Sequence, residues 1–167
     1  GSNWQLMQTA VKTSMEGGNP YLPSEVQKQN PTINLSWPYN AIWLPPVAAL
    51  TVIGRHQIVL FALFVCGLLI LPKRIEEREL AGVFAFSLCM TLNSGNIAVL
   101  EFVAMCLMFL LIHNSKNTLA ASVLGTISTM KLLPITFFAA LPTTRSRLQC
   151  LAAFATATVF GMAIMPS

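Results

Sequence analysis

The sequence predicts an all-α protein, organised as a polytopic bundle of transmembrane helices. Of its 167 residues, 54% are hydrophobic and 10% are charged, and the mean hydropathy is +0.65. Soluble domains contain roughly 25% charged residues on average. The apolar residues recur in several blocks separated by short polar, glycine-containing or proline-containing segments. Together these observations favour a multi-pass membrane protein over a water-soluble globule.

Residues 1–40 are predicted to form an external region with an amphipathic surface helix. Apolar side chains recur at helical spacing along residues 3–16, at Trp4, Met7, Val11 and Met15. The sequence Gly17-Gly18-Asn19-Pro20 should end this helix, since glycine supplies a left-handed stop and proline cannot continue a helix. A polar loop with several prolines follows up to residue 40.

Residues 41–167 are predicted to be the transmembrane helical region. Residues 41–53 are apolar but shorter than the roughly 20 residues that cross a bilayer, so we expect a re-entrant or interfacial helix there. About five spans should follow, at residues 58–71, 80–92, 97–112, 119–141 and 148–165. The chain starts without Met and stops directly after an apolar block, so we expect an internal fragment of a longer protein.

Charge and cysteine usage exclude two function classes. The ten Lys and Arg residues are scattered, with no run longer than Lys73-Arg74, so the chain lacks the basic stripe that binds nucleic acid. The four cysteines lie inside apolar blocks, without a C-x-x-C pair and without His at ligand spacing. They are interpreted as packing residues, and no metal site and no cofactor is predicted.

Lys131 is the first candidate site residue. It lies about 20 Å along the predicted helix from Thr118, deep in the bilayer core, where an ammonium costs a few kcal/mol unless it finds an anion. Pro134 should kink the helix beside it and free a backbone carbonyl. The position predicts binding of an anion such as a lipid phosphate, and the alternative is a lysine that snorkels to the surface.

Glu101 and the turn Asn93-Ser94-Gly95-Asn96 are further candidates. Glu101 lies just inside its predicted span, where it could accept a proton, pair with Lys131 or another buried cation, or stay protonated. The alternative is a glutamate near an interface. The turn offers donors and acceptors suited to sugar hydroxyls, although an ordinary connection between helices would look the same.

Four segments in this order resemble the polyprenyl-phosphate-dependent GT-C membrane glycosyltransferases, and most of all glycosyltransferase family 87. They are residues 16–21 (EGGNPY), 37–39 with 44–46 (WPY and LPP), 94–96 (SGN) and 131–134 (KLLP). The resemblance implies transfer of a hexose, often mannose, from a polyprenyl phosphate sugar to a hydroxyl of a membrane lipid or glycan acceptor, with inversion. It also implies an integral, multi-pass location in the plasma membrane of a prokaryote, with the active face outside.

The resemblance implies a role for each candidate. Lys131 would hold the donor phosphate, and Tyr21, Asn93, Gly95 and Asn96 would contact sugar or acceptor. The family's general base is an Asp just before the surface helix, and matching residues 17–21 places that position at Asn3. Asparagine does not titrate near neutral pH, so it cannot remove the acceptor's proton.

Three functional hypotheses follow. In the first, the protein is a hexosyltransferase in which Glu101 or Glu25 approaches the face that carries Asn3. In the second, it is a membrane transporter or lipid-binding protein in which Lys131 and Glu101 coordinate a substrate without chemistry. In the third, it is a non-catalytic glycosyltransferase homologue, because Asn3 replaces the expected Asp.

Overall fold

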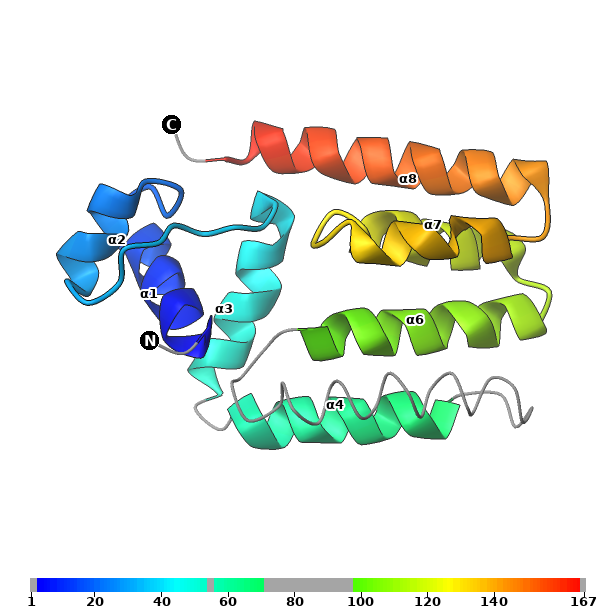
Figure 1. Cartoon of the computed structure of the whole chain (residues 1–167), viewed down its shortest axis with the longest axis horizontal. Coiled ribbons are helices and arrows are strands. Elements are labelled where there is room, and N and C mark those ends of the chain that lie inside the picture. The colour runs from blue at the N-terminus through cyan, green and yellow to red at the C-terminus, as the bar shows by residue number, and fades with distance from the viewer. Residues whose placement is uncertain (1–2, 54–55, 71–97, 166–167) are drawn as a thin grey trace.

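The computed structural model describes residues 3–53, 56–70 and 98–165, and within them the chain forms helices and loops without strands (Figure 1). The predicted all-α class is confirmed for this part of the chain. The elements in order are α1 (Asn3–Met15), α2 (Pro23–Gln29), the 3-10 helix η1 (Ala41–Trp43), α3 (Leu44–Val52), α4 (His56–Ile70), α6 (Ala98–His113), α7 (Asn117–Ile127), the 3-10 helix η2 (Leu133–Ala140) and α8 (Thr144–Ala163).

Helices α4, α6, α7 and α8 form a stack in chain order, in which each packs on the next. Figure 1 shows α1, α2 and α3 gathered at one end of this stack, where α6 begins and where α7 and α8 end. The N-terminal helices also contact the stack through α3 with α4 and through η1 with α8. This end therefore brings together segments from the two halves of the sequence.

Local signals explain where two of the helices begin. Helix α8 starts with a capping box, in which the Thr143 side chain accepts a hydrogen bond from the Ser146 amide at 3.1 Å and Ser146 in turn caps Thr143. Helix α3 has Pro45 and Pro46 in its first turn, where a missing amide hydrogen breaks no helical bond. The proline pair thus starts a helix instead of interrupting one.

Two apolar clusters hold the helices together. The larger one joins the N-terminal helices to α4, α6 and the end of α7, and its buried members include Trp4, Met7, Trp37, Val47, Leu60, Phe64, Val99, Phe102, Ile127 and Met130. The smaller one lies between α6, α7 and α8, around Met108, Ala120, Ala121, Leu124, Leu141 and Cys150. The outer helices α4 and α8 also leave large apolar side chains exposed, among them Phe61, Leu69, Leu148, Val159 and Phe160.

The prediction of a polytopic bundle with about five membrane spans is wrong. Among the described residues, none of the helices has both the length and the apolar content that crossing a bilayer requires. Helices α4 and α6 form where two spans were predicted, and they have 15 and 16 residues. Their lengths of about 22 to 24 Å are less than the thickness of a bilayer's apolar core, about 30 Å. The predicted span at residues 119–141 is split into α7 and η2. The one predicted at 80–92 lies outside the described residues.

Helix α8 has 20 residues, but its first two turns contain Arg145, Arg147 and Gln149. The predicted integral, multi-pass location in a prokaryotic plasma membrane rested on these spans, and the same finding overturns it. The predicted re-entrant or interfacial helix at residues 41–53 is also corrected. It forms η1 and α3, with Val47 and Leu50 buried in the larger apolar cluster.

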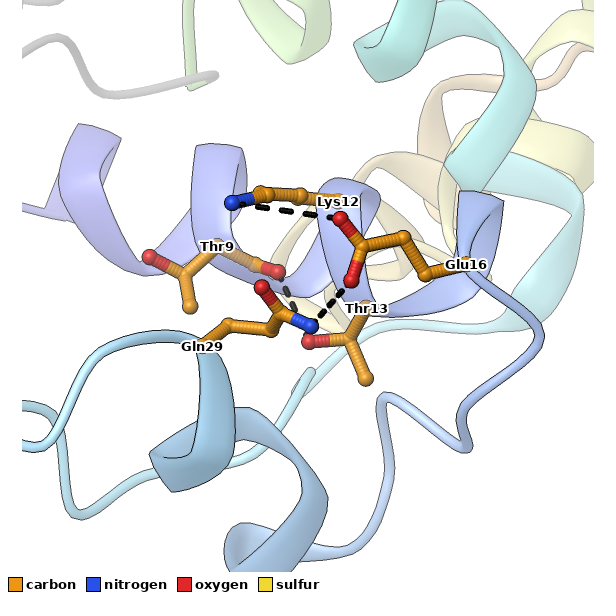
Figure 2. Close-up of polar contacts among 5 residues, drawn as sticks. All are labelled: Thr9, Lys12, Thr13, Glu16 and Gln29. Atoms are coloured by element: carbon orange, nitrogen blue, oxygen red, sulfur yellow. Dashed lines mark hydrogen bonds and ion pairs between the residues drawn. The ribbon is translucent and has the colours of Figure 1, made fainter.

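The amphipathic pattern of residues 3–16 gives a helix, but its apolar face packs on protein. Trp4, Met7 and Val11 are buried in the larger cluster, whereas Met15 is 73% exposed. Figure 2 shows the polar side of α1, where Lys12 lies 3.8 Å from Glu16 and Gln29 of α2 donates a hydrogen bond to Glu16. Helical periodicity identifies the buried face correctly, but it does not say whether lipid or protein covers that face.

Gly125 sets the close approach of α7 to α8. A methyl group added there would lie 2.9 Å from the Ala153 Cβ and 2.9 Å from the Phe154 amide nitrogen, and closer still to the Cys150 carbonyl. Gly125→Ala should lower the free energy of unfolding by about 1–3 kcal/mol, since backbone atoms cannot move aside and this cost exceeds the gain in helix propensity. Urea unfolding measures the change. The control Thr118→Ala, exposed on the same helix, should shift it by less than about 0.5 kcal/mol, and equal effects would contradict this account.

Candidate functional site

A half-buried ion pair lies where α6 begins and where α7 gives way to η2. Glu101 is in the first turn of α6, and Lys131 is in the segment between α7 and η2. The Lys131 Nζ lies 3.6 Å from the Glu101 Oε1. Glu101 is 8% exposed, whereas 35% of the Lys131 side chain is exposed. The pair therefore has a buried carboxyl and a cation that solvent can reach.

The backbone around Lys131 is non-helical. Helix α7 ends at Ile127, and the amides of Thr129 and Met130 then bond the carbonyls three residues earlier, at 3.1 and 3.0 Å. Pro134 is buried in the first turn of η2, where its ring fixes the backbone without needing a donor. The kink that the sequence predicts beside Lys131 is thus a complete break between two helices.

One aromatic side chain of the N-terminal loop, Tyr39, lies near the cation, and two others contact Tyr39. The Lys131 Nζ lies 6.0 Å from the centroid of the Tyr39 ring, at the outer limit of a cation–π contact. Trp37 packs edge-on against Tyr39, with ring centroids 5.3 Å apart. The Tyr21 hydroxyl donates a hydrogen bond to the Tyr39 carbonyl at 3.0 Å. Tyr39 is thereby fixed near the cation, and Tyr21 holds its backbone.

A second contact ties the N-terminal region to the segment that carries Lys131. The Trp43 Nε1 donates a hydrogen bond to the Thr129 hydroxyl at 3.1 Å, and this hydroxyl donates to the Thr126 carbonyl at 2.7 Å. Trp43 is the last residue of η1, which starts when the Asn40 side chain accepts a hydrogen bond from the Ile42 amide. The residues from Tyr39 to Trp43 therefore contact the Lys131 segment twice.

Burial dominates the electrostatics of the site. It raises the pKa of the Glu101 carboxyl above its usual 4.5, and the nearby Lys131 ammonium opposes this rise in pKa. Among the described residues, the Glu101 Oε1 has no hydrogen-bond partner. Burial raises the pKa of Tyr21 to about 12, and burial with the Glu101 charge raises the pKa of Tyr39. Both phenols therefore remain hydroxyls near neutral pH.

A groove described away from the ion pair has no charged side chain in its lining. It is an open hollow of about 530 Å³ between η1, α7 and α8, and its lining consists of apolar and uncharged polar side chains: Ile42, Thr126, Gln149, Ala152, Ala153, Thr156, Ala157 and Phe160. Such a lining offers no group that exchanges a proton near neutral pH. In the described part of the chain, no group of three or more His, Cys, Asp or Glu side chains could hold a metal ion either. The ion pair is therefore the candidate site.

The structure brings together three of the residues singled out in the sequence. Glu101 and Lys131 form the ion pair, which was one of three alternatives for Glu101, and Tyr21 reaches them through Tyr39. Asn3 is the first residue of α1. Three candidates, Asn93, Gly95 and Asn96, lie outside the described residues.

Sequence reasoning missed three side chains of this site as functional residues, namely Tyr39, Trp43 and Thr129. The signal for the first two is the aromatic cluster of residues 37–43 in an otherwise polar loop. Thr129 has no such signal, because its partner is 86 residues away in sequence.

Comparisons of the chain with protein-family models, curated proteins and solved structures found no match. The resemblance to glycosyltransferase family 87 therefore stays a prediction.

The stability of the protein should depend on pH through Glu101. Between the ordinary pKa of 4.5 and the raised pKa of the folded state, the unfolded chain loses its proton while the folded protein keeps it. The free energy of unfolding of the parent, relative to Glu101→Gln, should therefore be highest below pH 4.5 and should fall as the pH rises through the raised pKa. Urea unfolding from about pH 4 to about pH 8 measures this difference. Parallel curves for parent and variant would contradict the burial argument.

Lys131→Met provides the companion measurement. Without the ammonium that favours the carboxylate, the fall in stability should extend to higher pH than in the parent. The variant should also lose stability near neutral pH, by less than the roughly 3–5 kcal/mol of a fully buried pair, because 35% of the lysine side chain is exposed. An unchanged pH range would mean that Lys131 does not interact with the carboxyl.

Proposed function

We propose that the Glu101–Lys131 site transfers a hexose from a lipid-linked sugar phosphate to an acceptor hydroxyl. The observation that carries this proposal is the 3.6 Å contact between a reachable ammonium and a buried carboxyl. Group transfer from a sugar phosphate needs a cation for the phosphate and a base for the acceptor, and these two groups can supply both. The resemblance of residues 131–134 to the family's phosphate-binding element supports the same assignment.

In this proposal, Lys131 binds the donor phosphate. The donor is a phosphodiester, and its phosphate gains a second negative charge when the bond to the sugar C1 breaks. A fixed ammonium at that oxygen stabilises the transition state more than the ground state, because the charge is still developing. Because 35% of the Lys131 side chain is exposed, a ligand can approach this residue from solvent.

Glu101 is the proposed general base. The acceptor oxygen attacks C1 with inversion, the bond from C1 to the phosphate oxygen breaks, and the acceptor's proton passes to the Glu101 Oε1. That oxygen has no hydrogen-bond partner among the described residues, and the raised pKa makes the carboxylate a stronger base than an exposed glutamate. Glu101 would thus perform the step that Asn3 cannot, because an amide does not titrate near neutral pH.

The loop tyrosines orient the substrates in this scheme. Tyr39 faces the cation, and its raised pKa keeps its hydroxyl available as a donor to a sugar hydroxyl. Tyr21 holds the Tyr39 backbone through its own hydrogen bond. Asn3, by contrast, favours a second candidate function, in which the site binds a lipid-linked phosphate without transferring the sugar.

Sugar transfer tests the proposal directly. The purified protein is given a radiolabelled polyprenyl phosphate hexose in detergent with a panel of acceptors. We expect Lys131→Ala to lower kcat/KM by about 10²- to 10³-fold and Glu101→Gln by about 10²- to 10⁴-fold. The exposed pair Lys12 and Glu16 has the same residue types at 3.8 Å, so Lys12→Ala and Glu16→Gln serve as matched controls that should keep the parent rate.

Other outcomes would change the assignment. A gain of transfer in Asn3→Asp without a loss in Glu101→Gln would place the base at residue 3. Donor binding that Lys131→Ala abolishes, with no transfer by the folded parent, would favour the binding function. If the folded parent showed no donor binding and no sugar transfer, both candidate functions would be refuted.

A further inference from the structure

We infer that Trp43 is a positioning residue, whose indole holds the segment that carries Lys131 in place beside Glu101. The inference rests on the proposed function for the role of Lys131 toward phosphate. Its geometric part, the placement of Lys131 against Glu101, stands on the described contacts alone.

The segment needs an external support because it is not part of a helix. Helix α7 ends at Ile127 and η2 starts at Leu133, so Lys131 lies between two regular elements. A residue in such a segment is not fixed by the regular hydrogen bonds of a helix on both sides. Yet its Nζ must remain within a few ångströms of the Glu101 carboxylate to form the observed pair.

The hydrogen bond from Trp43 to Thr129 supplies this support. Thr129 is two residues before Lys131, and its hydroxyl accepts from the Trp43 indole at 3.1 Å while donating to the Thr126 carbonyl at 2.7 Å. The hydroxyl therefore links η1 to the last turn of α7. The Trp43 ring itself packs against the larger apolar cluster, which gives the contact a fixed base.

Residues 39–43, which include Trp43, also approach the Lys131 ammonium through the Tyr39 ring. Tyr39 presents its ring to the Lys131 Nζ, and Trp43, four residues later, donates a hydrogen bond to the Thr129 side chain, two residues before Lys131. The Asn40 side chain, which accepts from the Ile42 amide at 3.1 Å, fixes the turn between them. Displacing one end of this stretch should therefore displace the ammonium relative to both Glu101 and a bound phosphate.

The test uses variants that separate the hydrogen bond from the packing. Trp43→Phe keeps an aromatic ring in the cluster and removes the indole donor. Thr129→Val removes the hydroxyl at nearly the same volume, and Thr129→Ser keeps it. Binding of inorganic phosphate to the purified protein, measured by calorimetry, is the first readout. The pH dependence of unfolding, relative to Glu101→Gln in the same background, is the second and needs no ligand.

Trp43→Phe and Thr129→Val should each weaken phosphate binding by about 5- to 10-fold, and the double variant should weaken it no further, because both remove one contact. The Thr129→Ser variant, which keeps the hydroxyl, should bind phosphate with nearly the parent's affinity. In both weakened variants, the pH-dependent loss of stability should also extend upward, in the direction expected for Lys131→Met. A purely structural role would lower stability equally at every pH.

The outcomes separate this inference from the proposed function. A folded Trp43→Phe protein with the parent's pH profile would overturn the positioning role, whether or not phosphate binds. Additive losses in the double variant would also overturn it. Absence of phosphate binding in the parent, with a shifted pH profile in Trp43→Phe, would refute the phosphate site and leave the positioning role supported.

Discussion

A carboxyl group surrounded by apolar side chains must take up a proton or find a cation, and Glu101 is in this situation. Its neighbours along α6, Val99 and Phe102, are members of the larger apolar cluster, and Glu101 itself is 8% exposed. The first turn of a helix favours a negative charge, but that contribution alone does not offset burial. The ammonium of Lys131 offsets part of the remaining cost of burial, so the pKa of the carboxyl stays raised, and it does so from the segment that follows the end of α7. The segment between α7 and η2 thus carries the cation that faces the buried Glu101.

The N-terminal region contacts the segment after α7 through side chains. The Trp43 indole donates a hydrogen bond to the Thr129 hydroxyl, and the Tyr39 ring lies near the Lys131 Nζ. Segments that are distant in sequence thus meet at one end of the stack, where side chains from the loop and from α6 can act on the same ligand.

The sequence identifies most of the helical segments, but it does not predict how long each helix is or which parts of the protein cover it. Helical periodicity identifies α1, and the rarity of charge in apolar surroundings singles out Glu101 and Lys131. The spans fail because hydropathy measures composition, whereas helix length depends on breaks such as the one before Pro134, and burial depends on which helices pack together. The bond between Trp43 and Thr129 could not be predicted, because nothing in either local sequence specifies a partner 86 residues away.

In the proposed transfer, the pairing of Glu101 with Lys131 couples phosphate binding to the proton affinity of the carboxyl. A donor phosphate competes with the carboxylate for the same ammonium, so its arrival weakens the interaction that favours the charged form of Glu101. The proton affinity of the carboxyl then rises at the moment when the acceptor hydroxyl must lose its proton. As the phosphate gains charge, it takes up the cation, and as Glu101 gains the proton, it ceases to need one. The two charge changes compensate each other within a distance of a few ångströms, which is why a base next to the phosphate-binding cation suits this reaction better than an isolated one.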